Sequence, residues 1–146
     1  MRHTIIRGMA RRLGATALLL ATFASWAATP AELQRGYAAE ATRASPGFGG
    51  FSADRGRRFF TTTHGNDWRC ASCHTDTPTA EGRHAVTGRA LRPLAPAANP
   101  VRFTDAAKVE KWFRRNCRDV VGRECTAVEK GDVLAWLTSL RAGGAR

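Results

Sequence analysis

Cys70-Ala71-Ser72-Cys73-His74 forms a C-x-x-C-H motif, the attachment signature of a covalently bound c-type haem. In such a site the two thiols add across the haem vinyl groups, and the histidine that follows supplies the fifth ligand of the iron. One turn of backbone presents both sulfurs to one edge of the porphyrin and leaves His74 beneath its face. We therefore predict that Cys70, Cys73 and His74 hold one haem, and the opposite face of the iron remains to be assigned.

Two other kinds of site share part of this motif. A thioredoxin-like dithiol uses C-x-x-C after a strand in a βαβ unit, but no such pattern precedes Cys70. A zinc site would combine this pair with Cys117 and Cys125, although it leaves the adjacent His74 unexplained. Haem attachment is the favoured interpretation, and zinc or dithiol chemistry stay as alternatives.

The amino terminus has the pattern of a secretory signal peptide. Residues 1–14 contain four arginines and no acidic residue, and an apolar stretch follows over residues 15–24. Ser25 and Ala27 fit the small positions of a cleavage site, so we expect cleavage after Ala27. The apolar stretch is shorter than the roughly 20 residues of a membrane anchor. We predict a signal peptide over residues 1–27 and a single periplasmic cytochrome c domain over residues 28–146.

The charge of the chain limits the kinds of partner. The net charge is +11, from 23 Lys and Arg against 12 Asp and Glu, and it stays positive after the signal peptide leaves. Scattered arginines in an exported chain do not indicate a nucleic-acid binder. They are typical of a solvated surface that steers an acidic partner protein during brief encounters. We expect no nucleic acid and no membrane anchor in the mature protein.

The apolar pattern of residues 28–146 is helical, without a competing strand pattern. Capping boxes at residues 29–32 and 126–129 predict the starts of two helices. The first helix is expected to run toward Thr42, and the last helix to about Arg141.

Two more helices complete the predicted fold. Ser52 or Ala53 opens a helix in which Gly56 and Phe60 share one face, and Thr104 is expected to cap another. The missing side chain at Gly56 lets this early helix approach the last helix closely. The layout predicts an all-α, class I cytochrome c fold, with four to five short helices around one covalently bound haem.

Residues 78–102 contain four prolines and are predicted to lack regular structure. A segment this long and irregular is usually functional or disordered, and here it can wrap the edge of a haem. Its candidates for pairing with the haem propionates are Arg83, Arg89 and Arg92.

The sixth ligand departs from that of the usual electron carrier, which is a Met thioether. The only methionines, Met1 and Met9, lie in the predicted signal peptide. The remaining candidates are His64, His84, Asn116, a lysine, or an empty position.

These candidates differ in placement. His64 lies on the wrong side of the attachment turn, whereas His84 could give a bis-His carrier or bond a propionate or carbonyl. Asn116 follows Trp112 and Phe113 by four and three residues, on the helix face that we expect to point inward. It either bonds the end of its helix or binds the iron through its amide oxygen.

Cys117 follows Asn116 directly, and Cys125 comes eight residues later. In an oxidising compartment these two cysteines should form a disulfide, once Cys70 and Cys73 are bound to haem. Such a bridge would connect the last two predicted helices.

The chain resembles a known family, the sphaeroides haem protein (SHP) type of oxygen-binding class I cytochromes c. The resemblance covers nearly all of the predicted mature chain. It rests on Cys70-Ala71-Ser72-Cys73-His74, on Thr87-Gly88 with Pro93-Leu94-Ala95-Pro96, on Arg102-Phe103-Thr104-Asp105, on Glu110-Lys111-Trp112-Phe113-Arg114-Arg115-Asn116-Cys117, and on Gly122-Arg123-Glu124-Cys125-Thr126.

The resemblance implies a redox-gated ligand site. It implies that Asn116 is the ferric sixth ligand, that Cys117 and Cys125 form a disulfide, and that a dihaem cytochrome c can donate electrons. Reduction would release Asn116, because an amide oxygen is a hard donor that suits Fe(III) better than Fe(II). We therefore expect O2, NO or CO to bind the ferrous haem. Whether the protein also acts as an oxidoreductase on such a gas stays open, and the sequence indicates no catalytic residue. The alternative is a simple periplasmic electron carrier with a His or no sixth ligand.

Overall fold

Five helices and one short hairpin form residues 28–141, the part of the chain that this computed structural model describes. The predicted signal peptide lies outside these residues. The all-α fold is confirmed. Its elements are α1 (Pro30–Ala44), α2 (Ala53–Thr61), α3 (Ala71–His74), β1 (Gly82–Arg83), β2 (Ala90–Leu91), α4 (Ala106–Val121) and α5 (Ala127–Ser139).

Local side-chain caps set most of the helix starts. The hydroxyls of Thr29 and Thr126 each accept a hydrogen bond from the backbone N–H of the glutamate three residues later. The carboxylate of that glutamate accepts one from the backbone N–H of the threonine, so both predicted capping boxes are present. The hydroxyl of Ser52 caps α2 by accepting a hydrogen bond from the backbone N–H of Arg55. These starts agree with the sequence prediction, while α5 ends two residues earlier than expected.

The predicted cap of α4 was wrong by one residue. The carboxylate of Asp105 accepts a hydrogen bond from the backbone N–H of Lys108 at 2.9 Å. The hydroxyl of Thr104 instead donates to the carbonyl of Val101 at 3.0 Å. A carboxylate at this position also interacts favourably with the positive end of the helix dipole, which favours Asp105 over the neutral hydroxyl.

Helices α2 and α5 cross in close contact at Gly56. A Cβ atom on Gly56 would overlap the backbone carbonyl of Asp132, so the predicted role of this glycine is confirmed. The Asp132 side chain is buried and accepts hydrogen bonds from Nε of Arg55 at 2.7 Å and from the backbone N–H of Ser52 at 2.6 Å. A buried carboxylate needs such partners, and these fix the start of α2 on α5.

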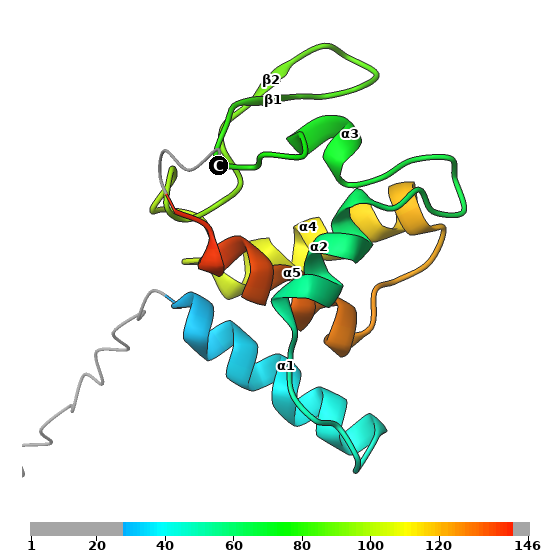
Figure 1. Cartoon of the computed structure of the whole chain (residues 1–146), viewed down its shortest axis with the longest axis vertical. Helices are drawn as coiled ribbons and strands as arrows, with labels where there is room; N and C mark the ends of the chain where they lie inside the picture. The colour runs from blue at the N-terminus through cyan, green and yellow to red at the C-terminus, as the bar shows by residue number, and fades with distance from the viewer. Residues whose placement is uncertain (1–27, 142–146) are drawn as a thin grey trace, which may run out of the picture.

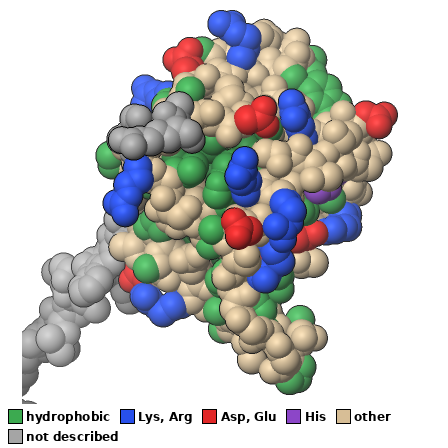
Figure 2. Space-filling view, viewed as in Figure 1, with side chains coloured by type: hydrophobic (Ala, Val, Ile, Leu, Met, Phe, Trp, Pro, Cys, Tyr) green, Lys and Arg blue, Asp and Glu red, His purple; other side chains and the backbone are tan. Residues whose placement is uncertain are grey.

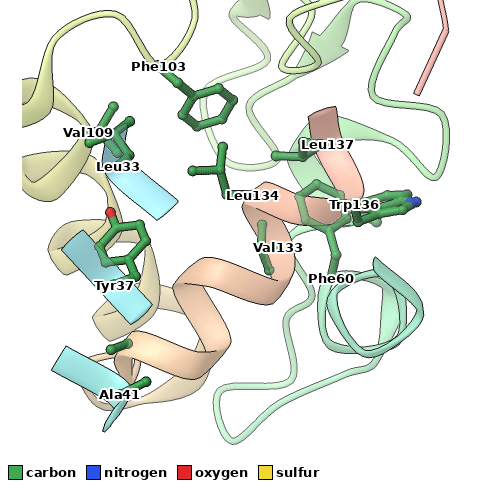
Figure 3. Close-up of a cluster of buried hydrophobic side chains, with 12 residues drawn as sticks. Leu33, Tyr37, Ala41, Phe60, Phe103, Val109, Val133, Leu134, Trp136 and Leu137 are labelled. Atoms are coloured by element: carbon green, nitrogen blue, oxygen red, sulfur yellow. The ribbon is translucent and has the colours of Figure 1, made fainter. Parts of the chain in front are cut away.

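The core surrounds α5, as Figure 3 shows. Leu134 and Leu137 of this helix are almost fully buried, with Phe60 of α2 on one side of the helix. Leu33 and Tyr37 of α1 lie on the other side. Helix α5 is therefore the central element to which both earlier helices attach. Within residues 28–141, no helix is both long enough and apolar enough to cross a membrane.

The segment between α3 and α4 forms the hairpin at the top of Figure 1 and then runs down past the end of α5 to reach α4. Its backbone is fixed at the carbonyl of Pro78, which accepts hydrogen bonds from the N–H groups of Leu94 and Ala95 at 2.9 and 3.0 Å. The prediction of no regular structure here was wrong in one detail, because β1 and β2 pair as antiparallel strands. Strands of two residues are too short to produce a sequence period.

Candidate haem-binding site

The attachment turn presents the donor set of a c-type haem. The backbone N–H of His74 donates to the carbonyl of Cys70 at 3.1 Å, so one helical turn separates the first cysteine from the histidine. The thiols of Cys70 and Cys73 are free and half-buried. The ring of His74 lies 6.3 Å from the ring of Phe60, centroid to centroid. Two thiols and one imidazole on a single turn match the ligands that covalent haem attachment needs.

Burial sets the protonation of these groups. Burial, with a smaller contribution from the charge of Arg102, lowers the pKa of His74 to about 4. Its imidazole is therefore neutral at pH 7 and keeps a lone pair for a metal. Burial raises the pKa of the Cys70 thiol to about 11, so Cys70 lacks the low pKa of a reactive dithiol. The environment suits haem attachment better than dithiol exchange.

The zinc alternative does not fit the placement of the cysteines. The Sγ atoms of Cys117 and Cys125 lie 1.95 Å apart, in a disulfide that connects the end of α4 to the start of α5. Within residues 28–141, no three His, Cys, Asp or Glu side chains gather in a way that could hold a metal ion. A zinc site that combines all four cysteines is therefore incompatible with this disulfide.

Apolar side chains surround the attachment turn, as a porphyrin requires. Ala71 and Phe103 belong to the buried core cluster, and Cys70 and Leu94 pack against it while remaining half-exposed; on α4, Phe113 packs against the same cluster next to Tyr37. These residues come from α3, from the loop before α4 and from α4 itself. Burial of apolar surface is the main source of stability for a large flat cofactor. The donor set and its surroundings together fit a haem.

The two histidine candidates for the sixth ligand are both engaged with nearby backbone. Nε2 of His64 lies 2.8 Å from the carbonyl oxygen of Phe59, and the ring of His64 packs on the ring of Phe59. Nδ1 of His84 accepts hydrogen bonds from the N–H groups of Val86 and Thr87 at 3.3 and 3.2 Å. Each ring stabilises its own turn through one nitrogen, and the lone pair on Nδ1 of His84 is used by backbone N–H groups.

The row of α4 that packs on the protein core differs in phase from the one expected from the sequence. The buried side of this helix contains Val109 and Cys117, with Phe113 between them, each four residues from the next. Asn116 precedes Cys117 and is therefore rotated about 100° away from that row. It shares an exposed face with Trp112, which is 41% exposed and lies one turn away. The phase differs because three apolar residues, Val109, Trp112 and Phe113, span more than one face.

Tethers hold α4, which bears Asn116, to the rest of the molecule. The side-chain amide of Asn66 donates to the carbonyls of Arg118 and Asp119 at 3.1 Å each. The disulfide fixes the same end of the helix. In the first half of α4, the hydroxyl of Tyr37 donates to Glu110, and Lys130 donates to the other carboxylate oxygen at 3.0 Å. The backbone beside Asn116 is thus fixed on both sides.

The arginines nominated for the propionates lie at the surface. Arg83, Arg89 and Arg92 are all exposed, and Arg83 donates to the carbonyl of Gly88 at 2.7 Å. Arg102, which was not among these candidates, is half-buried, and its positive charge helps to lower the pKa of His74. Its guanidinium donates to the carbonyls of Pro93 and Arg92 at 2.9 and 2.8 Å. No sequence pattern marks this position, since the burial of Arg102 depends on how the loop folds.

Comparison with known proteins places this geometry in a family. The family model described as "Domain of unknown function (DUF1924)" matches residues 46–137. "Cytochrome c-type protein SHP" from Cereibacter sphaeroides is 42% identical over 135 residues, which cover 90% of this chain and 99% of that protein. This chain belongs to the SHP family of c-type cytochromes. Its cofactor is one covalently bound haem c.

Solved structures agree with this assignment to the SHP family. The structure of oxidised SHP, described as an oxygen-binding cytochrome c, superposes with a TM-score of 0.70 at 42% identity, covering 78% of this chain and 99% of that chain. Oxidised cytochrome c'' from Methylophilus methylotrophus gives a TM-score of 0.69 at 36% identity, covering 75% and 93%. The class I cytochrome architecture predicted from the sequence is therefore confirmed.

Proposed function

We propose that this cytochrome binds a diatomic gas, O2, NO or CO, at its ferrous haem, and that Asn116 is a labile ligand that occupies the site in the ferric state. A bound haem c would supply an iron that can be ferric or ferrous, with His74 as its protein ligand on one side and Asn116 as the candidate on the other. His74 provides the proximal ligand, and Cys70 and Cys73 provide the covalent links. The protein exchanges electrons with a redox partner in the periplasm, after a signal peptide over residues 1–27 is removed.

The proposal depends on the different contacts that the three candidate ligands, His64, His84 and Asn116, make in the structure. His64 and His84 both bond to nearby backbone, whereas Asn116 lies on α4 one turn from the indole of Trp112. An amide oxygen is a hard, weak donor that matches Fe(III) better than the softer Fe(II). Asn116 can therefore bind one oxidation state and leave the other.

The tethers of α4 allow this exchange without unfolding the helix. Because Asn66 and the Cys117–Cys125 disulfide hold the end of α4, the movement of Asn116 can be confined to its own side chain. Trp112 supplies apolar cover beside the exchange position. Two relatives support such a site: SHP is described as an oxygen-binding cytochrome c, and the solution structure of cytochrome c'' addresses haem-ligand detachment.

Arg102 is the arginine best placed to pair with a haem propionate. A half-buried guanidinium is costly to keep without an anionic partner, and no ion pair within residues 28–141 includes Arg102. The hydrogen bonds to Pro93 and Arg92 use two of its five N–H donors and leave the others available. Arg83, Arg89 and Arg92 are less suited because they are exposed.

Optical spectra of the haem-loaded protein, recorded for the ferrous form with and without CO, test the proposed function. We expect a high-spin ferrous spectrum that changes to a six-coordinate spectrum when CO is added. A low-spin ferrous spectrum that ignores CO would instead support the simple electron carrier. The variant His84→Ala serves as the control, because it should leave both spectra unchanged unless His84 is an iron ligand.

A further inference from the structure

The hairpin of β1 and β2 extends beyond α3, away from the helices around α5 (Figure 1). Its ladder pairs Gly82 with Leu91 and Arg83 with Ala90. Beyond the ladder, the N–H of His84 donates to the carbonyl of Arg89, at 2.8 Å. The segment beyond the ladder, residues 84–89, is the hairpin tip.

Side chains hold the hairpin tip in one conformation. The Nδ1 atom of His84 accepts the N–H groups of Val86 and Thr87, and the guanidinium of Arg83 donates to the carbonyl of Gly88. Gly88 has a φ of 69°, a conformation that glycine adopts without strain. Because the hairpin tip is already ordered, it loses little conformational entropy when a partner binds it.

The hairpin rests directly on the attachment motif. The backbone N–H of Ala85 donates to Sγ of Cys73 at 3.3 Å. At the base of the hairpin, a Cβ on Gly82 would overlap the carbonyl oxygen of Cys73, so only glycine permits this approach. One hydrogen bond therefore separates the hairpin tip from a sulfur that binds the haem covalently.

The surface of the hairpin tip has the chemistry of a transient interface. Val86 is 77% exposed, more than any other large hydrophobic side chain in residues 28–141. Arg83 and Arg89 are exposed beside it, and no acidic residue occurs from Gly82 to Leu91, although Glu81 precedes them. An apolar centre with a charged rim is typical of protein interfaces. The cationic rim favours an acidic partner.

Exposed cations also lie along α4 around Trp112, at Lys108, Lys111, Arg114 and Arg115, but none of them is in contact with the attachment motif. Figure 2 shows Lys and Arg side chains spread over the face in view, with acidic side chains among them. Several surface arginines are also paired, as Arg69 is with Asp76 and Arg118 with Glu124. The hairpin tip differs because it combines exposed arginines, an exposed apolar side chain and contact with Cys73.

We propose that the hairpin tip is the docking surface for an acidic electron-donor protein, with Val86 at the centre of the contact and Arg83 and Arg89 at its rim. In the encounter the partner loses one electron and the ferric iron gains it, and no bond forms between the two proteins. This inference rests on the proposed function, in which the iron must be reduced before a gas binds. It adds the surface through which the electron arrives.

Stopped-flow reduction of the ferric protein by a reduced flavodoxin, a small acidic flavoprotein, tests this proposal. We expect the double variant Val86→Asn, Arg89→Glu, which lowers the net charge by two as the control does, to lower the second-order rate constant about tenfold or more at low ionic strength. The matched control is Arg43→Glu, an exposed arginine on α1, which should change the rate constant less than twofold. Reduction by dithionite should be equal in all three proteins, because it needs no protein docking.

A second measurement does not depend on the variants. Addition of oxidised flavodoxin to the wild-type haem protein should shift the amide NMR signals of residues 83–89 more than those of α1. Equal slowing by the tip and Arg43 variants, or shifts spread evenly over the protein, would overturn the docking proposal. CO binding to the ferrous form tests the proposed function separately, because it requires neither flavodoxin nor the hairpin tip.

Discussion

The helical half of this cytochrome, α1, α2, α4 and α5, is held together differently from the attachment half, residues 70–103. The helical half has an apolar core in which Phe60, Leu134 and Leu137 are at most 2% exposed. The attachment half contains few large buried side chains, and hydrogen bonds to the carbonyls of Pro78 and Pro93 fix its loop. The difference shows that the helices carry a core of their own, while the attachment half relies on hydrogen bonds and on its covalent haem.

The helical half should suffer most when its closest contact is blocked. Gly56→Val places side-chain atoms against the backbone of Asp132, which cannot move without displacing α5. We expect a loss of about 3 kcal/mol or more in the free energy of unfolding, measured by chemical denaturation of the haem protein. The control is Gly36→Ala on α1, where nothing lies within 4 Å of the new Cβ, and it should stabilise by roughly 0.5 to 1 kcal/mol. Equal stability of the two variants would contradict the close crossing.

The disulfide joins α4 to α5 within the helical half. The double variant Cys117→Ser, Cys125→Ser frees a loop with a sequence separation of 8 residues. The unfolded chain gains entropy, so we expect a loss of roughly 2 to 3 kcal/mol in unfolding free energy. Denaturation of the wild type after thiol reduction should give the same midpoint as the variant. A change below about 1 kcal/mol would mean that the other tethers of α4 suffice.

Arg102 tests the attachment half. Arg102→Gln removes the donor to Arg92 and a cation beside the predicted haem carboxylates. We expect a loss of about 1 to 2 kcal/mol in stability and a lower reduction potential, because a nearby positive charge favours the ferrous state. Arg92→Gln, at an exposed position, is the control and should leave the potential close to that of the wild type. The same potential in both variants would remove Arg102 from the haem site.

Glu129 is expected to make the smallest contribution to the free energy of unfolding, and this contribution depends on pH. Burial alone would raise the pKa of Glu129, but hydrogen bonds from Arg123 and Thr126 outweigh it and lower the pKa below 4.5. The carboxylate therefore stabilises the folded state above pH 4.5, and this contribution disappears as the pH falls through the lowered pKa. Glu129→Gln should cost roughly 1 kcal/mol at pH 7 and less at acidic pH. An unfolding free energy of Glu129→Gln that equals that of the wild type at every pH would contradict the assignment.

The sequence predicted the helical half well because its signals are local. Thr29 and Thr126 lie within three residues of the glutamates that complete their caps, and a glycine at position 56 is visible without any tertiary information. The face of α4 was harder to predict. Val109, Trp112 and Phe113 span more than one face of this helix, so their spacing alone does not say which side of α4 meets the protein core and which meets the haem.

The attachment half shows what sequence patterns could not predict. The C-x-x-C-H motif identifies Cys70, Cys73 and His74 by spacing alone. Arg102 has no such signal, since its contacts with Arg92 and Pro93 exist only after a ten-residue loop has closed. The contact between Ala85 and Cys73 similarly depends on a hairpin with strands of two residues.

The central claim, that Asn116 is a ligand released on reduction, is tested most directly by the ferric spectrum of the variant Asn116→Val. Valine is close in size to asparagine but offers no oxygen to the iron. We expect haem attachment to be preserved, the ferric iron to become five-coordinate and high-spin, and ferrous CO binding to persist. A ferric spectrum identical to that of the wild type would show that Asn116 is not a ligand and would contradict the account.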